Sequence, residues 1–492
     1  MNHLVPKSLL EKMAEWRKAA KAWKPWPYQG IGLKVTLEDS FSGLLLDPGM
    51  GKTSISLAAI KILLQKKLIK RALIFAPLRA VYEVWPAEAS DWTDFHSLGI
   101  AILHGPRKEA ILRALKPEHQ ICLINPEGAD WLFAKKERIK LLDADGLWVD
   151  ESSKWKKSTT VRFHALRPYL IKFKCRHILT GSPRPRHYLD LFGQIYILDR
   201  GATLGSYVTH YRNNFFFPTG YQMREWEPLP GSPEKINKLV APLVFRLEAK
   251  DYLKLPEVPP DKIHRIDLPA KVRVEYDKIE DSLMSTLFTE PLVHSASARS
   301  KCCQIANGAV YTDAPGEDFH KVQRPVKVVH TAKVEALADL VDELQGEPLL
   351  VGIGYHHDVS AIRAMIGKNT PCINSATTRT QAAKFIEDWN KGKISVLLGH
   401  PASMGHGLNL QGCGCRHVAY FDIPDDYDNY DQFFRRVWRQ GNKSQFVFRH
   451  HFVTRATVDE AKIINLKHKG SGQRDFLAAM KEYSKLRQRG KK

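Results

Sequence analysis

One stretch decides the fold: Leu44-Leu45-Leu46-Asp47-Pro48-Gly49-Met50-Gly51-Lys52-Thr53. An apolar run is followed by a Gly-rich turn and a helical pattern, which predicts a strand, a loop and a helix N-terminus. Glycines let backbone N–H groups approach an anion closely, and the helix dipole favours negative charge there. Lys52 could then reach the β- and γ-phosphates of a nucleotide, and the Thr53 hydroxyl could bind Mg²⁺. The full phosphate-loop pattern has Gly where Leu46 stands, so an ordinary Gly turn before a helix is the alternative.

The composition indicates a globular protein of more than one domain. A chain of 492 residues with 43% hydrophobic and 26% charged residues can bury two or three cores. It contains no apolar run of about 18 residues, so we expect no membrane span. The first seven residues lack the apolar core of a signal peptide. The seven cysteines are thinly spread, which suggests reduced thiols in a cytosolic compartment.

The net charge points to a polyanionic partner. The chain has 74 basic and 53 acidic residues, a formal excess of +21. The C-terminal segment Ala461–Lys492 alone holds ten Lys and Arg against two Asp and Glu. A solvated tail that only aids solubility is the alternative. Together with a nucleotide site, the charge favours nucleic acid as the partner.

Short apolar runs recur after the opening stretch. Helical or loop patterns separate these runs: Ala72–Phe75, Ile100–Leu103, Ile121–Ile124, Leu147–Val149 and Ile178–Leu179. Such alternation predicts a parallel sheet covered by helices on both faces. Ligands of such sheets bind at the C-terminal ends of the strands. Polar residues follow the predicted strands there: Asp47, Arg79, Asn125, Asp150, Glu151 and Thr180.

Asp150-Glu151 is the second chemical feature of this α/β region. Trp148-Val149 ends a predicted strand, so the paired carboxylates should point toward the phosphate site. Asp150 would hold Mg²⁺, largely through water, and Glu151 would orient and polarise the attacking water. Adjacent acids at a strand end are common on protein surfaces. About a hundred residues after Gly-Lys-Thr, within the same α/β pattern, the pair becomes a specific signal.

The pattern changes between residues 205 and 325. Aromatic residues cluster first, and a Pro-rich connector, Leu255-Pro256-Glu257-Val258-Pro259-Pro260, follows. Two helical stretches are expected near Ala270–Phe288 and Val293–Ile305. We interpret this segment as a mainly helical insertion between two lobes. The aromatic residues are more typical of a core than of a base-stacking platform.

A second α/β pattern extends to about residue 463. The predicted strands are Leu349–Ile353, Pro371–Ile373, Val396–Leu398, Val418–Phe421 and Phe446–Phe452. A Gly-rich loop, Ser403 to Gln411, follows one of them. Gln432, Arg436 and Arg439 are spaced four and three apart, so we expect a helix that presents them on one face. That face could supply arginine fingers to a bound γ-phosphate. A basic solvated helix is the alternative.

These motifs, in this order, resemble the Swi/Snf-type DNA translocase ATPases of helicase superfamily two, in particular compact phage or bacterial members. The resemblance covers roughly residues 26–463. The motifs that carry it are Trp26-Pro27-Tyr28-Gln29, Asp47 to Thr53, Ala76-Pro77-Leu78 with Val84-Trp85, Asp150 to Lys154, Leu179-Thr180-Gly181-Ser182-Pro183, Ser403 to Gln411, and Gln432 to Gly441. The family also lacks the first glycine of the phosphate loop, which accounts for Leu46.

The resemblance implies two tandem RecA-like lobes with ATP and Mg²⁺ as cofactors. The implied ATP-binding residues are Gln29, which reads the adenine edge, Gly49, Met50, Gly51, Lys52, Thr53, Ser54, Gly407 and Gln432. The implied catalytic residues are Lys52, Asp150, Glu151, Arg436 and Arg439. The implied metal ligands are Thr53 and Asp150. The implied nucleic-acid contacts are Arg79, Asn125, Thr180, His400 and Ser403.

The domains expected from the sequence are residues 1–204 (N-terminal helix and first lobe), 205–325 (insertion), 326–463 (second lobe) and 464–492 (basic tail). Ser153 departs from the family, which usually has His there, so coupling of hydrolysis to the second lobe should be tuned differently. Cys413-Gly414-Cys415-Arg416-His417 has crowded spacing, which favours structural cysteines over a metal site.

Three functions remain open on the sequence. The first is an ATPase that tracks along double-stranded DNA without separating the strands. The second is a strand-separating helicase acting on branched DNA or RNA, and the third is a non-hydrolysing nucleic-acid-binding scaffold. Lys52, Glu151 and the two arginines argue against the scaffold. We expect the protein to act as a monomer on DNA, in the cytoplasm of a bacterium or of a phage-infected host.

Overall fold

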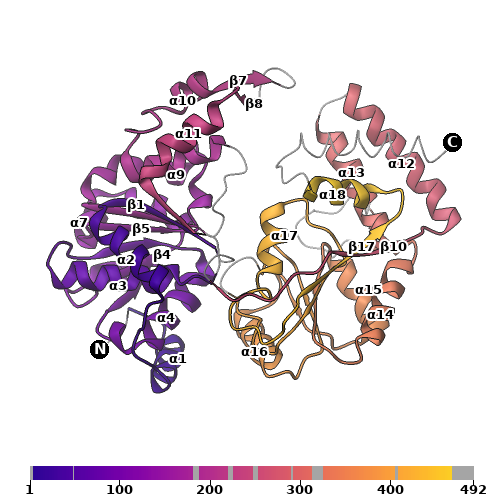
Figure 1. The fold of residues 1–492 in the computed structure, drawn as a ribbon, viewed down its shortest axis with the longest axis horizontal. Coiled ribbons are helices and arrows are strands. Elements are labelled where there is room, and N and C mark those ends of the chain that lie inside the picture. The colour runs from indigo at the N-terminus through magenta and orange to yellow at the C-terminus, as the bar shows by residue number, and fades with distance from the viewer. Residues whose placement is uncertain are drawn as a thin grey trace. The chain divides into compact units, whose positions relative to one another are not determined.

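A computed structural model describes residues 4–47, 49–180, 188–219, 225–247, 253–289, 292–312, 325–404 and 408–467. The chain divides into two compact units, residues 1–253 and 254–492. Each unit is built around one parallel sheet flanked by helices (Figure 1). The two sheets confirm the α/β class predicted from the alternating apolar runs.

The first unit holds a seven-stranded sheet in its described part, in the order β3-β4-β2-β5-β6-β1-β9. Every neighbouring pair of strands is parallel. The strands are β1 (Phe41–Leu46), β2 (Ala72–Phe75), β3 (Ile100–Ile102), β4 (Ile121–Ile124), β5 (Gly146–Asp150), β6 (Cys175–Thr180) and β9 (Val244–Leu247). Five of them match the predicted runs, and β1 is the strand expected before the phosphate loop. Their carboxyl ends therefore meet at one edge, as predicted.

Helices cover both faces of this sheet. They are α1 (Lys7–Lys18), α2 (Pro27–Glu38), α3 (Lys52–Gln65), α4 (Trp85–Asp91), α5 (Lys108–Arg113), α6 (Ala129–Phe133), α7 (Lys136–Leu142), α8 (Val161–Leu166), α9 (Leu191–Asp199), α10 (Val208–Phe215) and α11 (Ser232–Val240). An antiparallel hairpin, β7 (Phe216–Thr219) and β8 (Glu225–Pro228), belongs to the same unit. Tyr211 and Phe216 pack in the core, as expected for the aromatic cluster.

The second unit holds a six-stranded parallel sheet in its described part, in the order β10-β17-β16-β13-β15-β14. The strands are β10 (Lys262–Ile266), β13 (Leu349–Gly352), β14 (Cys372–Ile373), β15 (Val396–Gly399), β16 (His417–Tyr420) and β17 (Phe448–Thr454). The helices are α12 (Ala270–Thr289), α13 (Leu292–Asn307), α14 (Ala332–Glu343), α15 (His356–Ile366), α16 (Arg379–Asn390), α17 (Tyr427–Phe434) and α18 (Val458–Lys467). A short antiparallel pair, β11 (Ala309–Tyr311) and β12 (Val326–Val328), follows α13.

The segment expected as one helical insertion, residues 205–325, is shared between the two units. Its two long helices are present as α12 and α13, but β9 extends the first sheet and β10 extends the second. Each is an edge strand of its sheet, and each pairs with a strand about 190 to 200 residues away in the chain. The unit boundary lies between Leu253 and Lys254, inside the expected insertion.

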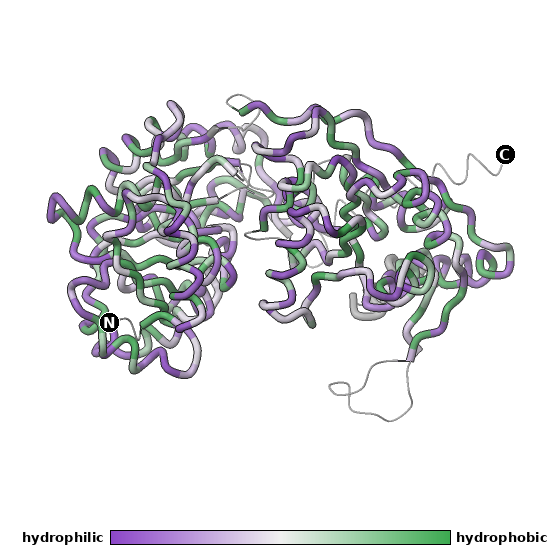
Figure 2. The backbone as a smooth tube through the Cα atoms, turned by 90° about the horizontal axis from the view of Figure 1, so that it is seen from below, coloured by the Kyte–Doolittle hydropathy of each residue, from purple (hydrophilic) through white to green (hydrophobic). Residues whose placement is uncertain are grey.

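The helices alternate hydrophilic and hydrophobic residues along their length (Figure 2). That pattern is typical of helices with one face on a sheet and the other in water. The core of the first sheet includes Leu73, Phe75, Val149 and Trp155, all fully buried. Within the described ranges, no helix is both long enough and apolar enough to span a membrane.

A buried polar network fixes helices of the second unit to one another. Lys333 on α14 donates to Asp459 on α18 at 2.7 Å and to Asn307 on α13 at 2.9 Å. The side chains of Lys333 and Asp459 are completely buried. Asn307 in turn donates to both carboxylate oxygens of Asp358 at 3.3 Å. Because each buried charge has a partner, the network ties α13 to the body of the unit.

All seven cysteines are free thiols, and six of them are buried. Burial raises the pKa of Cys122 and Cys175 to about 12 and that of Cys372 to about 11. Cys415 lies in the core of the second unit, where its thiol bonds to the carbonyls of Pro348 and His417 at 3.2 and 3.3 Å.

Candidate active site

The predicted phosphate loop connects β1 to α3. Gly49 and Gly51 both have left-handed backbone angles, with φ of 85° and 76°. Gly51 is the N-cap of α3, which begins at Lys52. The loop therefore leads directly into a helix N-terminus, where backbone N–H groups can meet an anion. Pro48 lies outside the described residues.

Gln29, the residue expected to read adenine, lies against this loop. It belongs to the first turn of α2 and is only 7% exposed. Its side-chain oxygen accepts the N–H of Trp26 at 2.9 Å, and its Nε2 donates to the carbonyl of Met50 at 3.3 Å. A Cβ on Gly51 would stand 2.2 Å from that Nε2. Gln29 therefore contacts the loop and bonds to it through one Nε2 hydrogen. The second Nε2 hydrogen remains for a ligand.

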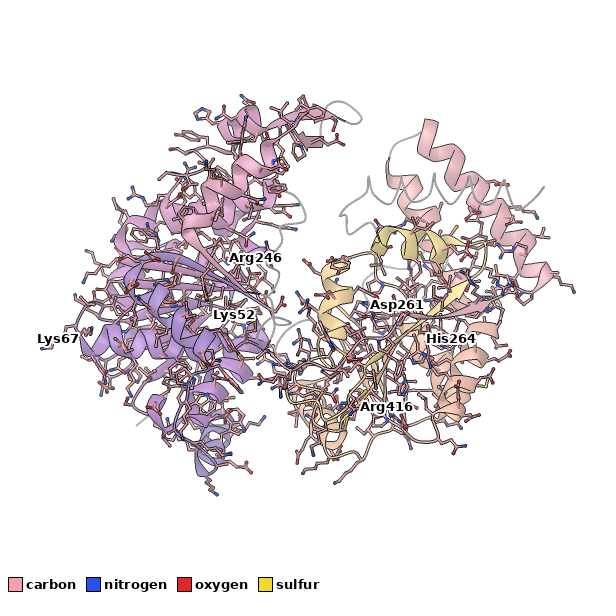
Figure 3. All side chains as sticks on the ribbon, viewed as in Figure 1. Lys52, Lys67, Arg246, Asp261, His264 and Arg416 are labelled. Atoms are coloured by element: carbon pink, nitrogen blue, oxygen red, sulfur yellow. The ribbon has the colours of Figure 1, made fainter. Side chains whose placement is uncertain are left out.

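The Lys52 ammonium folds back over the end of β1. Nζ donates to the carbonyl of Leu46 at 2.7 Å and to that of Asp47 at 3.3 Å. Thr53 follows in the first turn of α3, and the Ser54 hydroxyl donates to the carbonyl of Gly51 at 3.0 Å. Figure 3 labels Lys52 within the first unit. Lys52 thus lies beside the end of β1, at the edge of the sheet where the strands end.

Asp150 is the last residue of β5 and is nearly buried. Burial, followed by the neighbouring charge of Glu151, raises its pKa to about 6. A hydrogen bond from Trp85 and the positive charge of Lys52 act in the opposite direction. Since β5 and β1 both pair with β6 in parallel, the structure brings the strand-end carboxylate and the loop that carries Lys52 to the same edge of the sheet. In the sequence these two residues are about a hundred positions apart.

Glu151 has a left-handed backbone, with φ of 49°. Such a conformation is uncommon for a residue with a Cβ, and it is concentrated at functional sites. Its own N–H donates to Asp150 Oδ1 at 3.0 Å. The turn directs the chain away from the sheet immediately after Asp150, into a short 3₁₀ turn that begins at Ser152.

The expected nucleic-acid contacts of the first unit lie at the same edge of the sheet. Arg79 follows β2, and its Nε bonds to Glu83 at 2.7 Å. Asn125 follows β4 and donates to Glu127 at 2.8 Å. Thr180 is the buried last residue of β6. Gly181, Ser182 and Pro183 lie outside the described residues.

The helix expected to present Gln432, Arg436 and Arg439 is shorter than predicted. Gln432 belongs to α17, but this helix ends at Phe434, and both arginines lie in the turns that follow. The prediction of one helical face was therefore wrong. A spacing of four and three fits a helix, but the helix ends at Phe434, and both Phe434 and Val437 in the turns belong to the buried core.

The turns nevertheless bring the two arginines together. Arg436 Nη1 donates to the carbonyl of Leu408 at 3.4 Å, and Arg439 Nη1 reaches the same carbonyl at 3.5 Å. Arg439 also donates to Asn409 Oδ1 at 2.6 Å. The arginines therefore gather on the end of the Gly-rich loop. Gly407 itself lies outside the described residues.

His400 and Ser403 follow β15 in the second unit. The Ser403 N–H donates to the carbonyl of His400 at 2.9 Å, so the two residues share one turn. This turn follows the carboxyl end of a strand, as the nucleic-acid candidates of the first unit do. Among the described residues, no cluster of three or more His, Cys, Asp or Glu side chains could hold a metal ion.

Trp85 lies at the site although the sequence predicted no role for it there. It is completely buried, and its indole Nε1 donates to Asp150 Oδ2 at 3.0 Å. The only signal in the sequence was its place, with Val84, in the motif that begins at Ala76-Pro77-Leu78. A buried tryptophan is expected to fill a core, so its hydrogen bond to the site could not be anticipated.

Comparison with known proteins gives the family. The SNF2-related domain matches residues 16–306, more than half of the chain. The chain belongs to the SNF2-related family. The helicase conserved C-terminal domain matches residues 332–441. This SNF2-related protein therefore has the helicase-like ATPase core of an ATP-hydrolysing family, and its two parallel sheets are the expected tandem RecA-like lobes.

Two relatives resemble the SNF2-related chain over most of its length. Putative protein p41 of Acyrthosiphon pisum secondary endosymbiont phage 1 is 31% identical, over 94% of this chain and 99% of the relative. The DNA repair and recombination protein RAD54B of Gallus gallus is 21% identical over 87% of this chain. The match spans 51% of the chicken protein.

Solved structures similar to the SNF2-related chain include the Sulfolobus solfataricus SWI2/SNF2 ATPase core in complex with dsDNA. It is 18% identical, with coverage of 91% of this chain and 93% of that chain and a TM-score of 0.41. The Sulfolobus solfataricus SWI2/SNF2 ATPase core domain is 19% identical, with coverage of 96% of each chain and a TM-score of 0.40.

Proposed function

We propose that this SNF2-related protein is a DNA-dependent ATPase that couples ATP hydrolysis to movement along double-stranded DNA. The observation that carries the proposal is the placement of Lys52, at the start of α3, and of Asp150 and Glu151, at the end of β5, along one edge of the same parallel sheet. A cation at a Gly-rich helix start and two carboxylates at a neighbouring strand end are the parts that phosphoryl transfer from ATP requires.

The side chains present fit both ATP and Mg²⁺. Mg²⁺ prefers oxygen ligands, which the Asp150 carboxylate and the Thr53 hydroxyl supply. When bound, the ion would neutralise charge on the β- and γ-phosphates. Gly49, Met50, Gly51 and Ser54 would line the phosphates, and Gln29 would contact the base. Further ATP contacts are proposed for Gln432 and Gly407.

Lys52 and Glu151 would divide the chemistry in the first unit. Lys52 would exchange its bonds to the carbonyls of Leu46 and Asp47 for bonds to phosphate oxygens, a charge-assisted exchange. Glu151 would orient the attacking water and accept its proton. The left-handed backbone of Glu151 supports this role, since such conformations of residues other than glycine are concentrated at functional sites.

Arg436 and Arg439 would act as arginine fingers for the γ-phosphate. Both now bond to neutral oxygen atoms, the Leu408 carbonyl and the Asn409 amide. A phosphate oxygen would be a stronger acceptor than either.

The DNA contacts would come from residues that follow the strands. Arg79 and Asn125 each bond to an acidic side chain two or four residues away, and a phosphate could replace that acid. Thr180, His400 and Ser403 complete the proposed contacts. The formal charge of +21 and the chicken relative named as a DNA repair and recombination protein support DNA as the partner. The phage relative supports the cytoplasm of a bacterium or infected host.

The test compares Lys52→Ala and Glu151→Gln with the wild-type protein and with Glu137→Gln, which changes an exposed acid on α7 in the same way. We expect DNA to stimulate ATPase activity in the wild type and in Glu137→Gln, and both site variants to lose it. DNA-stimulated turnover that survives in Glu151→Gln would remove its catalytic role. A triplex-displacement assay beside a fork-unwinding assay then separates movement on duplex DNA from strand separation.

A further inference from the structure

Trp85 is the first residue of α4, and it is fixed against the proposed metal carboxylate. Its indole Nε1 donates to Asp150 Oδ2 at 3.0 Å, while the N–H of Glu151 donates to Oδ1 at 3.0 Å. Each oxygen of this carboxylate therefore accepts one hydrogen bond from the described part of the chain. Each oxygen also retains a second lone pair for another partner.

An unusual backbone brings the indole to this position. Residues Ala80–Val84 form a π-helix between β2 and α4, and the N–H of Trp85 bonds to the carbonyl of Ala80. A π turn carries more residues per turn than an α-helix, and such turns are frequent at functional sites. Arg79 is the N-cap of this turn. The π turn therefore sets the rotation of α4 and aims Trp85 at the end of β5.

We propose that Trp85 is a positioning residue that holds the Asp150 carboxylate in the orientation needed to bind Mg²⁺. The inference rests on the proposed function of Asp150. An indole N–H can only donate, so it favours one carboxylate orientation and contributes no ligand of its own. Hydrogen-bond partners of metal ligands are known to tune metal affinity by roughly 10- to 100-fold.

A purely space-filling role would leave a different signature. Trp85 is completely buried, so its ring contributes to packing whatever its N–H does. The two roles separate when the ring shape is kept and the donor is removed. Benzothienylalanine has the shape of tryptophan but carries sulfur in place of the indole N–H. Trp85→Phe is a second, smaller replacement that also lacks the donor.

A matched control exists in the same unit. Trp155 is also completely buried, and its indole nitrogen has no hydrogen-bond partner among the described residues. Benzothienylalanine at this position removes a donor that bonds to nothing there. This substitution should therefore leave metal and nucleotide binding as in the wild type.

The experiment measures the affinity of the full chain for a fluorescent ATP analogue, in EDTA and in increasing Mg²⁺. We expect benzothienylalanine at position 85 to leave the affinity in EDTA unchanged and to raise the half-saturating Mg²⁺ concentration roughly tenfold. Electron paramagnetic resonance of Mn²⁺ in the presence of the analogue should report the same loss of metal affinity.

Two results would overturn the positioning role. One is a half-saturating Mg²⁺ concentration equal to that of the wild type. The other is an equal loss of affinity with and without the ion, which would indicate packing alone. Trp85→Phe must change Mg²⁺ dependence in the same direction if the lost donor is the cause. Failure of the wild-type protein to bind the analogue with Mg²⁺ would instead refute the proposed function itself.

Discussion

Replacement of Gly51 by alanine tests the contact between the phosphate loop and Gln29. Gly51 has a φ of 76°, and a Cβ there would lie 2.2 Å from Gln29 Nε2 and 3.0 Å from the hydroxyl of Ser54. The Gln29 amide is buried and bonds to Met50 and Trp26. Alanine would therefore force both a strained backbone and a displaced amide.

The two effects can be given separate magnitudes. A left-handed backbone costs a residue with a Cβ about 1–2 kcal/mol. Displacing the Gln29 amide loses two hydrogen bonds, each worth about 1 kcal/mol. Gly51→Ala should thus lower the free energy of unfolding by roughly 3–4 kcal/mol. Gly105 has a φ of 82°, and a Cβ added there would meet no atom within 4 Å. Gly105→Ala should therefore lower the free energy of unfolding only by the cost of the left-handed backbone, about 1–2 kcal/mol.

Urea unfolding followed by tryptophan fluorescence provides the assay. Only Trp389 and Trp438 of the eleven tryptophans belong to the second unit, so the signal reports mainly on the first. In a Gln29→Ala background the clash with the Gln29 amide is absent, and the cost of Gly51→Ala should fall toward that of Gly105→Ala. Equal costs of Gly51→Ala in the two backgrounds would refute the reasoning.

Three further predictions concern other parts of the chain. Burial and Glu151 raise the pKa of Asp150 to about 6, so the carboxyl gains a proton and loses Mg²⁺ as the pH falls through that value. ATPase activity should fall as Asp150 becomes protonated. Because Mg²⁺ competes with the proton, the acidic decline in a pH–rate profile should move to lower pH at the higher of two Mg²⁺ concentrations. An acidic decline at the same pH for both concentrations would contradict this. Arg439→Ala should leave ATP affinity unchanged and slow turnover by about 10³-fold or more. Nucleotide titration and steady-state ATPase assays measure the two quantities. A loss of affinity with normal turnover per bound ATP would exclude Arg439 as an arginine finger. Lys333→Met leaves Asp459 buried without its partner and should cost about 3–5 kcal/mol in urea unfolding, whereas the added change Asp459→Leu should recover part of that cost.

Local sequence patterns predicted the parts of the fold that depend on local chemistry. The apolar runs at Ala72–Phe75 and Ile121–Ile124 became β2 and β4 with the same bounds. Gly-Lys-Thr indicated the start of α3 within one residue. These features follow from burial on both faces of a parallel sheet and from glycine at left-handed positions.

Features that depend on distant partners could not be predicted. β9 pairs with β1, and β10 with β17, so their role as edge strands is set by residues far along the chain. The turns after Phe434 depend on how that end of α17 packs in the core. The hydrogen bond from Trp85 to Asp150 depends on the π turn, and no periodic pattern of apolar residues in the sequence predicts such a turn. Tertiary packing decided each of these outcomes.

The buried thiols make the native chain a convenient background for site-specific dyes. Thiolates attack maleimide reagents, and burial raises the pKa of Cys122, Cys175 and Cys372 to values between about 11 and 12. A cysteine introduced at an exposed position of each unit would therefore react well ahead of the six buried native thiols, and Cys413 is the partly exposed exception. Once Cys413 is replaced, fluorescence energy transfer between two such dyes could follow the separation of the units through each round of ATP turnover, with the six buried cysteines left in place.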